Sequence, residues 1–438
     1  MIDTTTPDPA DESSHTMDTH LPDRVAGLVQ PVSPLINATR GQSEQIGFLL
    51  IITVLMMLFS MAQLQWAPQV QSEAEIEHAS QVLSDYQEIH SNTIETAATG
   101  ARGSSVLHLG TSYPSYLILA HPPDPSGGLY TESNKSLELR NAQAPNDETA
   151  DYLDGSTKSF KHTRLRYQPQ YYQQTEAGDT IIEQGIVYQH FRSGERISET
   201  PQLVDGNRIN LIASTGDIAT ARSESVTVDT VPLSASSQTV LVEPESSSDP
   251  FEISFESNLS ESQWRNILSN EIDPGPANSP NNDKYISELD KSGDTITITF
   301  ETTGNPTYEI DAAKIGYKLG DQAAFSESEN PDVKYLTTQQ ATNRSVQANG
   351  SIMLEVTAND RYANPKSTVP IEVNVIGAGT ADRINRVTRN DGQAVIVYQA
   401  PPTATGTETV VVSIDDSQLN TSLGNDVKSV TFDIKIQD

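Results

Sequence analysis

One uninterrupted apolar run dominates the distribution of hydrophobic and polar residues along the chain. It extends from Ile46 to Trp66 and contains no charged side chain, although the rest of the sequence is polar and acidic. A helix of this length, rising 1.5 Å per residue, crosses the roughly 30 Å hydrocarbon core of a bilayer. A buried core helix is the alternative, but such a helix normally carries a polar stripe, and this run has none. The pattern predicts a transmembrane helix over residues 42–66 and a membrane as partner.

After Ala67 the apolar positions follow a helical stripe. They recur at three- and four-residue steps, which is typical of an amphipathic helix, and include Ile76, Ala79, Val82, Leu83, Tyr86, Ile89, His90 and Ala97. Gly100 and Gly103 then predict its end. We therefore expect the membrane helix to continue as an amphipathic stalk over residues 67–100. In this interpretation His90 lies on the packing face and His78 on a solvated flank.

From Val106 onward, short apolar or alternating runs separated by turn residues predict β-strands. In the first part these runs are Ser105–Gly110, Ser115–Ala120, Asp179–Phe191, Arg208–Ser214, Gln238–Pro244, Thr295–Phe300 and Tyr308–Leu319. One helix interrupts them, because Ser260 and Gln263 have the spacing of a capping box. Together these elements predict a β-rich domain over residues 101–320.

A second β-rich unit follows a polar segment, residues 321–344, which is expected to be a linker. Its runs are Ser351–Asp360, Thr368–Ile376, Gln393–Ala400, Thr407–Asp415 and Lys428–Ile436. Their spacing and their Asn, Asp, Gly and Pro turns predict a β-sandwich over residues 345–438. The fold class expected for the whole chain is α+β, mainly β.

The N-terminal residues 1–41 are rich in Thr, Asp, Pro and Ser, which predicts a disordered tail. Arg24 and Arg40 precede the apolar run, whereas Glu73, Glu75 and Glu77 follow it. Since positive residues favour the cytoplasmic side, the expected topology is single-pass in the cell membrane. The N-terminus is then cytoplasmic and the bulk of the chain extracellular.

Composition narrows the function classes. The chain has 438 residues and a formal net charge of −32, so its surface repels the phosphates of nucleic acids. The composition, with abundant Asp and Glu and little Lys, resembles that of proteins from halophilic archaea. In those organisms concentrated salt screens the repulsion between the negative charges. There is no cysteine, which excludes disulfides, thiolate nucleophiles and Cys-based zinc sites.

The stretch from Arg40 to Gly47, running into the apolar segment, resembles the class III signal of archaeal type IV pilin-like proteins. The resemblance implies cleavage after Gly41 by a membrane peptidase, with Gln42 as the new N-terminus and the apolar helix retained. Glu44 would be the third mature residue, whereas this family usually has its glutamate at the fifth. The resemblance implies that Glu44 pairs with the free amine of a neighbouring subunit in an assembly. The alternative is an ordinary anchor that is not cleaved.

Two further resemblances concern the extracellular part. Leu109–Pro114, Pro122–Leu129 and Leu203–Leu211 are similar to a group of haloarchaeal membrane proteins without an established activity. Asp360–Pro365 and Asp391–Tyr398 resemble the bacterial Ig-like repeats of invasin- and intimin-type surface proteins. Such repeats act as spacers or adhesive modules, so this resemblance implies a binding or scaffold role.

No motif for catalysis or for a cofactor stands out. The eight histidines lack metal-ligand spacing, and no nucleophile elbow or phosphate-binding loop is present. Calcium at Asn359–Asp360 and Asp415–Asp416 remains an alternative. The basic cluster Lys158, Lys161, Arg164 and Arg166 is interpreted as one charged strand face, with aromatic residues opposite. Outward-facing N-glycosylation sequons occur at Asn134, Asn258, Asn343, Asn349 and Asn420.

Three functions agree with these observations. The first is a non-enzymatic pilin-like subunit, or an adhesion or structural component of the cell envelope, that self-assembles or joins other pilin-like subunits. The second is an uncleaved anchor that presents an extracellular binding domain to a cell-envelope or surface partner. The third, which the sequence favours least, is an ectoenzyme that uses carboxylates of the central domain.

Overall fold

The computed structural model describes residues 39–114, 123–200, 202–273, 284–326, 330–403, 406–415, 417, 419 and 429–437. The run Ser115–Ala120 and the sequon Asn420 lie outside these residues, as does the tail as far as residue 38. The chain divides into two compact units, Met1–Ala62 and Gln63–Asp438. The boundary falls within one helix, α1, which extends from Thr39 to Thr99 and continues through Pro68.

Helix α1 ends at the glycine that the sequence indicated. Gly100 has a φ of +71°, the left-handed conformation that favours glycine after a helix. Its N–H donates a hydrogen bond to the carbonyl oxygen of Thr96 at 3.0 Å. Gly103 is already the first residue of strand β1.

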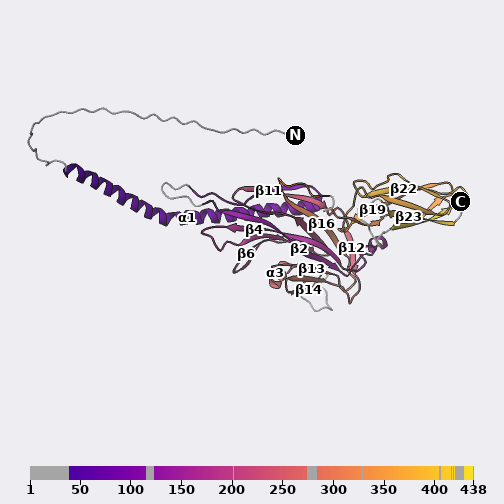
Figure 1. Ribbon diagram of the computed structural model, residues 1–438. Helices are drawn as coiled ribbons and strands as arrows, with labels where there is room; N and C mark the ends of the chain where they lie inside the picture. Colours follow the sequence, from indigo (N-terminus) through magenta and orange to yellow (C-terminus); the bar gives the residue numbers. More distant parts are fainter. Residues whose placement is uncertain are drawn as a thin grey trace, which may run out of the picture. The chain divides into compact units, whose positions relative to one another are not determined.

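The domain that follows contains two β-sheets (Figure 1). In the seven-stranded sheet, β16 pairs antiparallel with β11 and β12 and parallel with β9. β16 runs from Tyr308 to Leu319, the bounds that alternation predicted. The other strands are β1 (Gly103–His108), β3 (Ala142–Gln143), β8 (Val204–Asp205), β9 (Arg208–Gly216), β11 (Ser225–Ser234) and β12 (Val240–Pro244).

The nine-stranded sheet has the order β14-β15-β13-β2-β4-β5-β6-β7, and β10 also pairs with β2. Its long strands are β2 (Ser126–Arg140) and β4 (Lys158–Gln170). The shorter ones are β5 (Asp179–Glu183), β6 (Ile186–Phe191), β7 (Gly194–Glu199), β10 (Ala219–Arg222), β13 (Glu252–Glu256), β14 (Ile286–Ser292) and β15 (Thr295–Phe300). The run Asp179–Phe191, expected as one strand, is therefore a hairpin. Gln184 and Gly185 form its two-residue turn, and both have positive φ, at +47° and +72°.

Two short helices complete this domain, α2 (Asp147–Ala150) and α3 (Glu261–Ile267). The capping box predicted at Ser260 is present. The side-chain oxygen of Ser260 accepts a hydrogen bond from the backbone N–H of Gln263, and the side-chain oxygen of Gln263 accepts one from the backbone N–H of Ser260. Trp264 of α3 is fully buried and packs edge-on against Phe255, with ring centroids 4.9 Å apart. Through Trp264 the helix contributes to the larger hydrophobic core of this domain.

The amphipathic helix expected over residues 67–100 is present, and its apolar face is buried in this domain. Val82, Tyr86 and Ile89 share a core cluster with side chains of both sheets, among them Leu107 and Leu165. Ile76 was wrongly included in the stripe, because its side chain is 56% exposed. The cluster shows that the second half of α1 is a core element of the domain.

The C-terminal unit is a sandwich of two four-stranded sheets, with orders β17-β19-β22-β21 and β18-β24-β23-β20. Named in chain order, these are the A-B-E-D and A′-G-F-C sheets of an immunoglobulin-type fold. The strands are β17 (Val333–Thr337), β18 (Asn343–Gln347), β19 (Ser351–Asp360), β20 (Ile371–Ile376), β21 (Thr380–Arg383), β22 (Gln393–Gln399), β23 (Gly406–Ile414) and β24 (Ser429–Gln437). Their inward-facing residues, including Leu354, Ile396, Val412 and Phe432, form one core.

The expected linker, residues 321–344, needs a correction. It contains β17 and the first residues of β18, so part of it belongs to the sandwich. Val333, Tyr335 and Leu336 are buried there, although the flanking sequence is polar. A five-residue strand beside an acidic stretch gives too short an apolar signal to be recognised from the pattern alone.

The sandwich contacts the central domain through polar and aromatic groups. Asn364 is buried, and its Nδ2 donates to Ser234 Oγ at 2.8 Å and to the carbonyl oxygen of Ala312 at 2.7 Å. The rings of Tyr152 and Tyr335 stack with centroids 5.5 Å apart. The turn Asp360–Pro365, which resembles Ig-like repeats, thus lies against the preceding domain.

Candidate functional site

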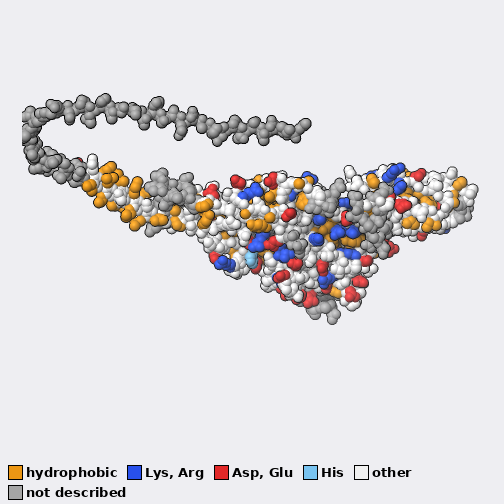
Figure 2. All heavy atoms as spheres, in the orientation of Figure 1, with side chains coloured by type: hydrophobic (Ala, Val, Ile, Leu, Met, Phe, Trp, Pro, Cys, Tyr) orange, Lys and Arg blue, Asp and Glu red, His pale blue; other side chains and the backbone are white. Residues whose placement is uncertain are grey.

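The apolar segment of α1 is the first candidate site. Phe48 and Leu64 are more than 60% exposed, and the neighbouring large apolar side chains are exposed as well. Figure 2 shows the segment as a largely apolar surface. Among the described residues, one helix is long and apolar enough to cross a membrane, with a mean hydropathy of 2.3. Gly41, Gln42 and Glu44 lie within α1, and Glu44 is exposed.

Glu75 fixes the following part of α1 to the domain, and sequence reasoning used it only for topology. Its carboxylate is fully buried and accepts a hydrogen bond from the hydroxyl of Tyr113. It also accepts from three consecutive backbone N–H groups, those of Tyr172, Gln173 and Gln174, at 2.6 to 3.2 Å. Successive N–H groups aimed at one point form an anion-binding nest. The buried carboxylate is therefore well compensated.

His78 and Asp85 add two further contacts on the same helix. His78 is buried, contrary to the expected solvated flank, and its Nε2 lies 3.0 Å from the carbonyl oxygen of His108. Its Nδ1 lies 2.6 Å from the hydroxyl of Tyr171. Burial lowers the pKa of His78, so the neutral ring donates to the carbonyl and accepts from the tyrosine. Asp85 accepts from the backbone N–H of His108 and contacts its ring Nδ1 at 2.8 Å. His90 lies on the packing face, as predicted.

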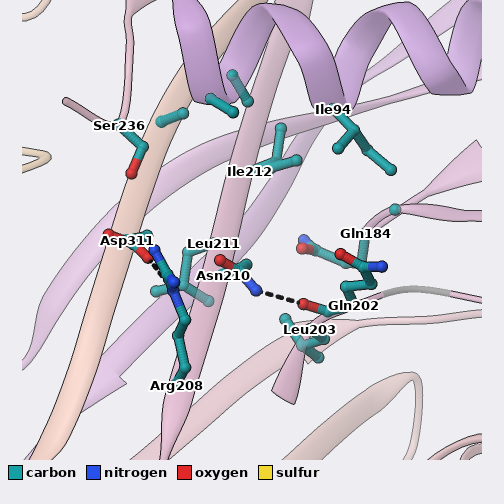
Figure 3. A pocket seen from close by; sticks show the side chains of 14 residues that line it. Ile94, Gln184, Gln202, Leu203, Arg208, Asn210, Leu211, Ile212, Ser236 and Asp311 are labelled. Carbon is teal, nitrogen blue, oxygen red and sulfur yellow. Dashed lines mark hydrogen bonds and ion pairs between the residues drawn. The ribbon is translucent and has the colours of Figure 1, made fainter. Parts of the chain in front are cut away.

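A cavity of about 260 Å³ lies beside the end of α1. Its wall is mainly aliphatic and comes from α1, from β9 and β16, and from the segment before β8; the apolar lining residues are Ile94, Ala97, Ala98, Leu203, Leu211, Ile212 and Ala313. Figure 3 shows Arg208 and Asp311 at one end and Gln184 and Gln202 at the other. Arg208 Nε donates to Asp311 at 2.6 Å, and Asp311 also accepts from Thr239 Oγ1 at 2.7 Å.

Gln184 is the unusual member of this lining. Its side chain is 4% exposed, yet neither amide atom has a hydrogen-bond partner among the described residues. Ser236 contributes another buried oxygen without such a partner. The sequence gives one signal for this turn, the pair Gln184–Gly185 between two β-branched runs, and we did not recognise it.

A second, water-sized cavity lies next to the first and shares Gln184, Gly185, Ile94 and Ile212 with it. His162 lines it, and burial lowers the pKa of this ring to about 3, with the charge of Arg164 acting in the same direction. The backbone N–H of Ser214 donates to His162 Nδ1 at 3.2 Å, so the remaining proton lies on Nε2. His162 is therefore a buried, neutral imidazole in the wall of this small cavity.

Arg164 and Arg166 of the basic cluster on β4 pair with carboxylates. The buried Arg164 lies with its Nε 2.8 Å from Oε2 of the equally buried Glu183, as an ion pair without hydrogen-bond alignment. Burial raises the pKa of Glu183, and Arg164 opposes that rise. Arg166 pairs with Glu132 and Asp179. Because Tyr167 is buried on the opposite side of the strand, the charged-face interpretation holds at this end of β4.

The other predicted positions lie apart from the cavity. Asn343 and Asn349 are exposed, and Asn258 is exposed while its Oδ1 accepts from Arg164 at 3.0 Å. Asn134 belongs to β2, but its side chain is outside the described set. Of the calcium candidates, Asp416 is not described, and Asp360 accepts from the backbone N–H groups of Tyr362 and Asn364. Within the described ranges, no three acidic or histidine side chains form a group suited to a metal ion.

Comparison with known proteins gives limited matches. No family model matches the chain. An uncharacterised protein of Archaeoglobus fulgidus is 25% identical over 174 residues, which are 40% of this chain and 29% of that protein. Among solved structures, domains 4 and 5 of the S-layer protein SbsC match 33% of this chain and 65% of theirs, with 15% identity and a TM-score of 0.20.

The D00-D0 domain of intimin matches 33% of this chain and 77% of its own, with 15% identity and a TM-score of 0.19. The chain thus spans less than two thirds of the first relatives in both comparisons. At these TM-scores the superpositions do not establish a common fold. The immunoglobulin-type assignment of the C-terminal unit rests on its own strand order.

Proposed function

We propose that this protein is a non-enzymatic, membrane-anchored component of the cell surface, which acts in assembly or adhesion as a pilin-like subunit. The observation that carries this proposal is the division of α1. Its first part exposes apolar side chains from Ile46 to Trp66, whereas its later part is buried in a β-rich domain. An exposed apolar surface of this length must be covered by lipid or by other apolar helices.

The extracellular part supports a structural or adhesive role. An immunoglobulin-type sandwich presents two sheets and hydrogen-bonded loops, and such modules commonly act as spacers or binding units. Its buried contacts with the central domain, through Asn364 and Tyr152, favour a firm connection between the two. A firm connection suits a load-bearing surface component.

The chemistry of the cavity favours binding over catalysis. Its charged lining residues are Arg208 and Asp311, and these are paired with each other. A general base or nucleophile needs a perturbed group within reach of a substrate; besides the Arg208–Asp311 pair, the described lining supplies amides, the hydroxyl of Ser236 and aliphatic carbons. An ectoenzyme therefore remains the weaker proposal.

The experiment has two readouts. Mass spectrometry of the N-terminus, on protein from native membranes, is expected to give a start at Gln42. Glu44→Ala is expected to insert into membranes at the wild-type level but to lose assembly, measured by cross-linking and filament recovery. Gln45→Ala is the matched control and is expected to assemble normally.

Two results would overturn the pilin-like proposal. One is an unprocessed N-terminus together with normal assembly of Glu44→Ala. The other is a wild-type protein that stays monomeric in native membranes. Both would support the second candidate, an uncleaved anchor that presents its β-domains as a binding surface.

A further inference from the structure

Gln184 carries two unfavourable features at once. It occupies the first position of a two-residue hairpin turn with a φ of +47°, where Gly or Asn is preferred over a longer side chain. Its amide is buried without a protein partner, and desolvation of an unpaired amide is also unfavourable. Neither feature contributes to the stability of the hairpin. Backbone strain combined with an unpaired buried polar group indicates a functional constraint at this residue.

The cavity defines where that constraint acts. Gln184 lines the 260 Å³ cavity together with the aliphatic side chains of α1 and β9, and Figure 3 shows it opposite the Arg208–Asp311 pair. Gln202, at the same end, and Arg208 are exposed, so the cavity is reachable from solvent. Pockets for small molecules combine an apolar wall with a few convergent polar groups, which is the composition found here.

We propose that this cavity binds a neutral aliphatic peptide unit, in which the backbone amide of the ligand pairs with the amide of Gln184 and a small aliphatic side chain fills the apolar wall. A primary amide offers one acceptor and one pair of donors, so a peptide group satisfies both of its atoms. The buried Oγ of Ser236 supplies one more polar group in the same lining. This inference is independent of the proposed surface role.

Charge and shape decide against other ligand classes. The Arg208 guanidinium is paired with Asp311 and also lies near Asp205 and Glu309, so a carboxylate ligand would meet a net negative surrounding. Among the described residues that line the cavity, none carries an aromatic ring on which a sugar could stack. A pure hydrocarbon would leave the Gln184 amide unpaired. The volume is just below the roughly 300–1,000 Å³ of drug-sized pockets, which fits one or two amino-acid residues.

The test uses the full chain in lipid nanodiscs and N-acetyl-leucinamide as the probe. Calorimetric titration and NMR are expected to show saturable binding, with shifts at the Gln184 side chain. Gln184→Met, which has a similar length but no amide, is expected to weaken binding about tenfold or more. Its unfolding midpoint is expected to equal or exceed that of the wild type, since an unpaired polar group is removed. A residue needed only for structure would instead lose stability.

Controls and opposing outcomes follow from the same geometry. Gln168→Met, at an exposed position of β4 outside the cavity lining, is expected to leave the affinity for the probe unchanged. Gln184→Gly removes the backbone strain of the positive φ and replaces the methionine variant in the test if that variant does not fold. It is also expected to lose binding of the probe. The proposal is overturned if the probe does not bind, if Gln184→Met binds it as well as wild type, or if N-acetyl-leucine or N-acetylglucosamine binds more tightly.

Discussion

The carboxylate of Glu75 in α1 accepts a hydrogen bond from the backbone N–H of Gln174 at 2.6 Å. Ninety-nine residues separate the two positions, and the same carboxylate also accepts from the two preceding N–H groups. A buried anion held by several N–H groups joins the helix to the loop after β4. These N–H groups take the place of water around the carboxylate, so removal of the carboxylate leaves them as unpaired donors.

Glu75→Ala is accordingly expected to lower the free energy of unfolding by about 3 kcal/mol. The measurement is chemical unfolding monitored by circular dichroism. Glu77→Ala, two residues further along and exposed, is the matched control and is expected to stay within about 0.5 kcal/mol. Equal effects of the two substitutions would contradict the role assigned to the nest.

The buried His162 predicts a defined loss of stability in acid. Its pKa is about 3 in the folded protein and about 6.5 when unfolded, so the unfolded state binds the extra proton between these values. Stability is therefore retained above pH 6.5 and falls as the pH drops toward 3. From pH 7.5 to 5, this one group is expected to remove about 2 kcal/mol.

His78 shifts in the same direction, whereas Asp360, whose pKa burial raises to about 6, acts in the opposite one. The comparison that isolates His162 is His162→Asn, which keeps an acceptor for the N–H of Ser214. Its unfolding midpoint is expected to depend less on pH between 7.5 and 5. A pH dependence identical to that of the wild type would rule out the assigned titration.

The ion pair between Arg164 and Glu183 predicts a non-additive pair of substitutions. Arg164→Met leaves the Glu183 carboxyl buried without its partner and is expected to lose about 3 kcal/mol or more of stability. The double variant Arg164→Met, Glu183→Met removes both charges and is expected to recover most of that loss. For the exposed pair of Arg192 and Glu176, the corresponding single change is expected to be within about 0.5 kcal/mol.

Asn364 predicts how the two β-domains unfold. Its side chain donates two hydrogen bonds to the central domain and accepts one from the N–H of Ser237 at 3.2 Å. Asn364→Ala is expected to separate one calorimetric unfolding transition into two, because the interface loses its buried polar contact. Asn390→Ala, at an exposed position of the same sandwich, is expected to leave the transition unchanged.

The sequence predicted elements whose periodicity is strong. β15 and β16 have the bounds that alternation indicated, and the capping box at Ser260 begins α3 as expected. These signals are local, since they depend on neighbours within a few residues. The apolar run from Ile46 was equally clear.

The features that the sequence did not predict depend on tertiary contacts. His78 was assigned to solvent because its buried partners, Tyr171 and the carbonyl of His108, come from other elements. Gln184 escaped notice because an unpaired amide has no sequence pattern; only the folded chain shows that its partner is absent among the described residues. Processing after Gly41 and the role of Glu44 stay predictions.

The pairing of β18 with β24 has a mechanical consequence. These strands run parallel from the Asn343–Asp433 pair to the Gln347–Gln437 pair, and they are the second and the last strand of the sandwich. Tension applied between the start of β18 and the end of β24 pulls these two strands along each other, so their hydrogen bonds share the force simultaneously. An antiparallel pair pulled from one end would instead open bond by bond. The sandwich is thus arranged to resist stretching along its chain direction, and its rupture force should exceed what its thermal stability implies.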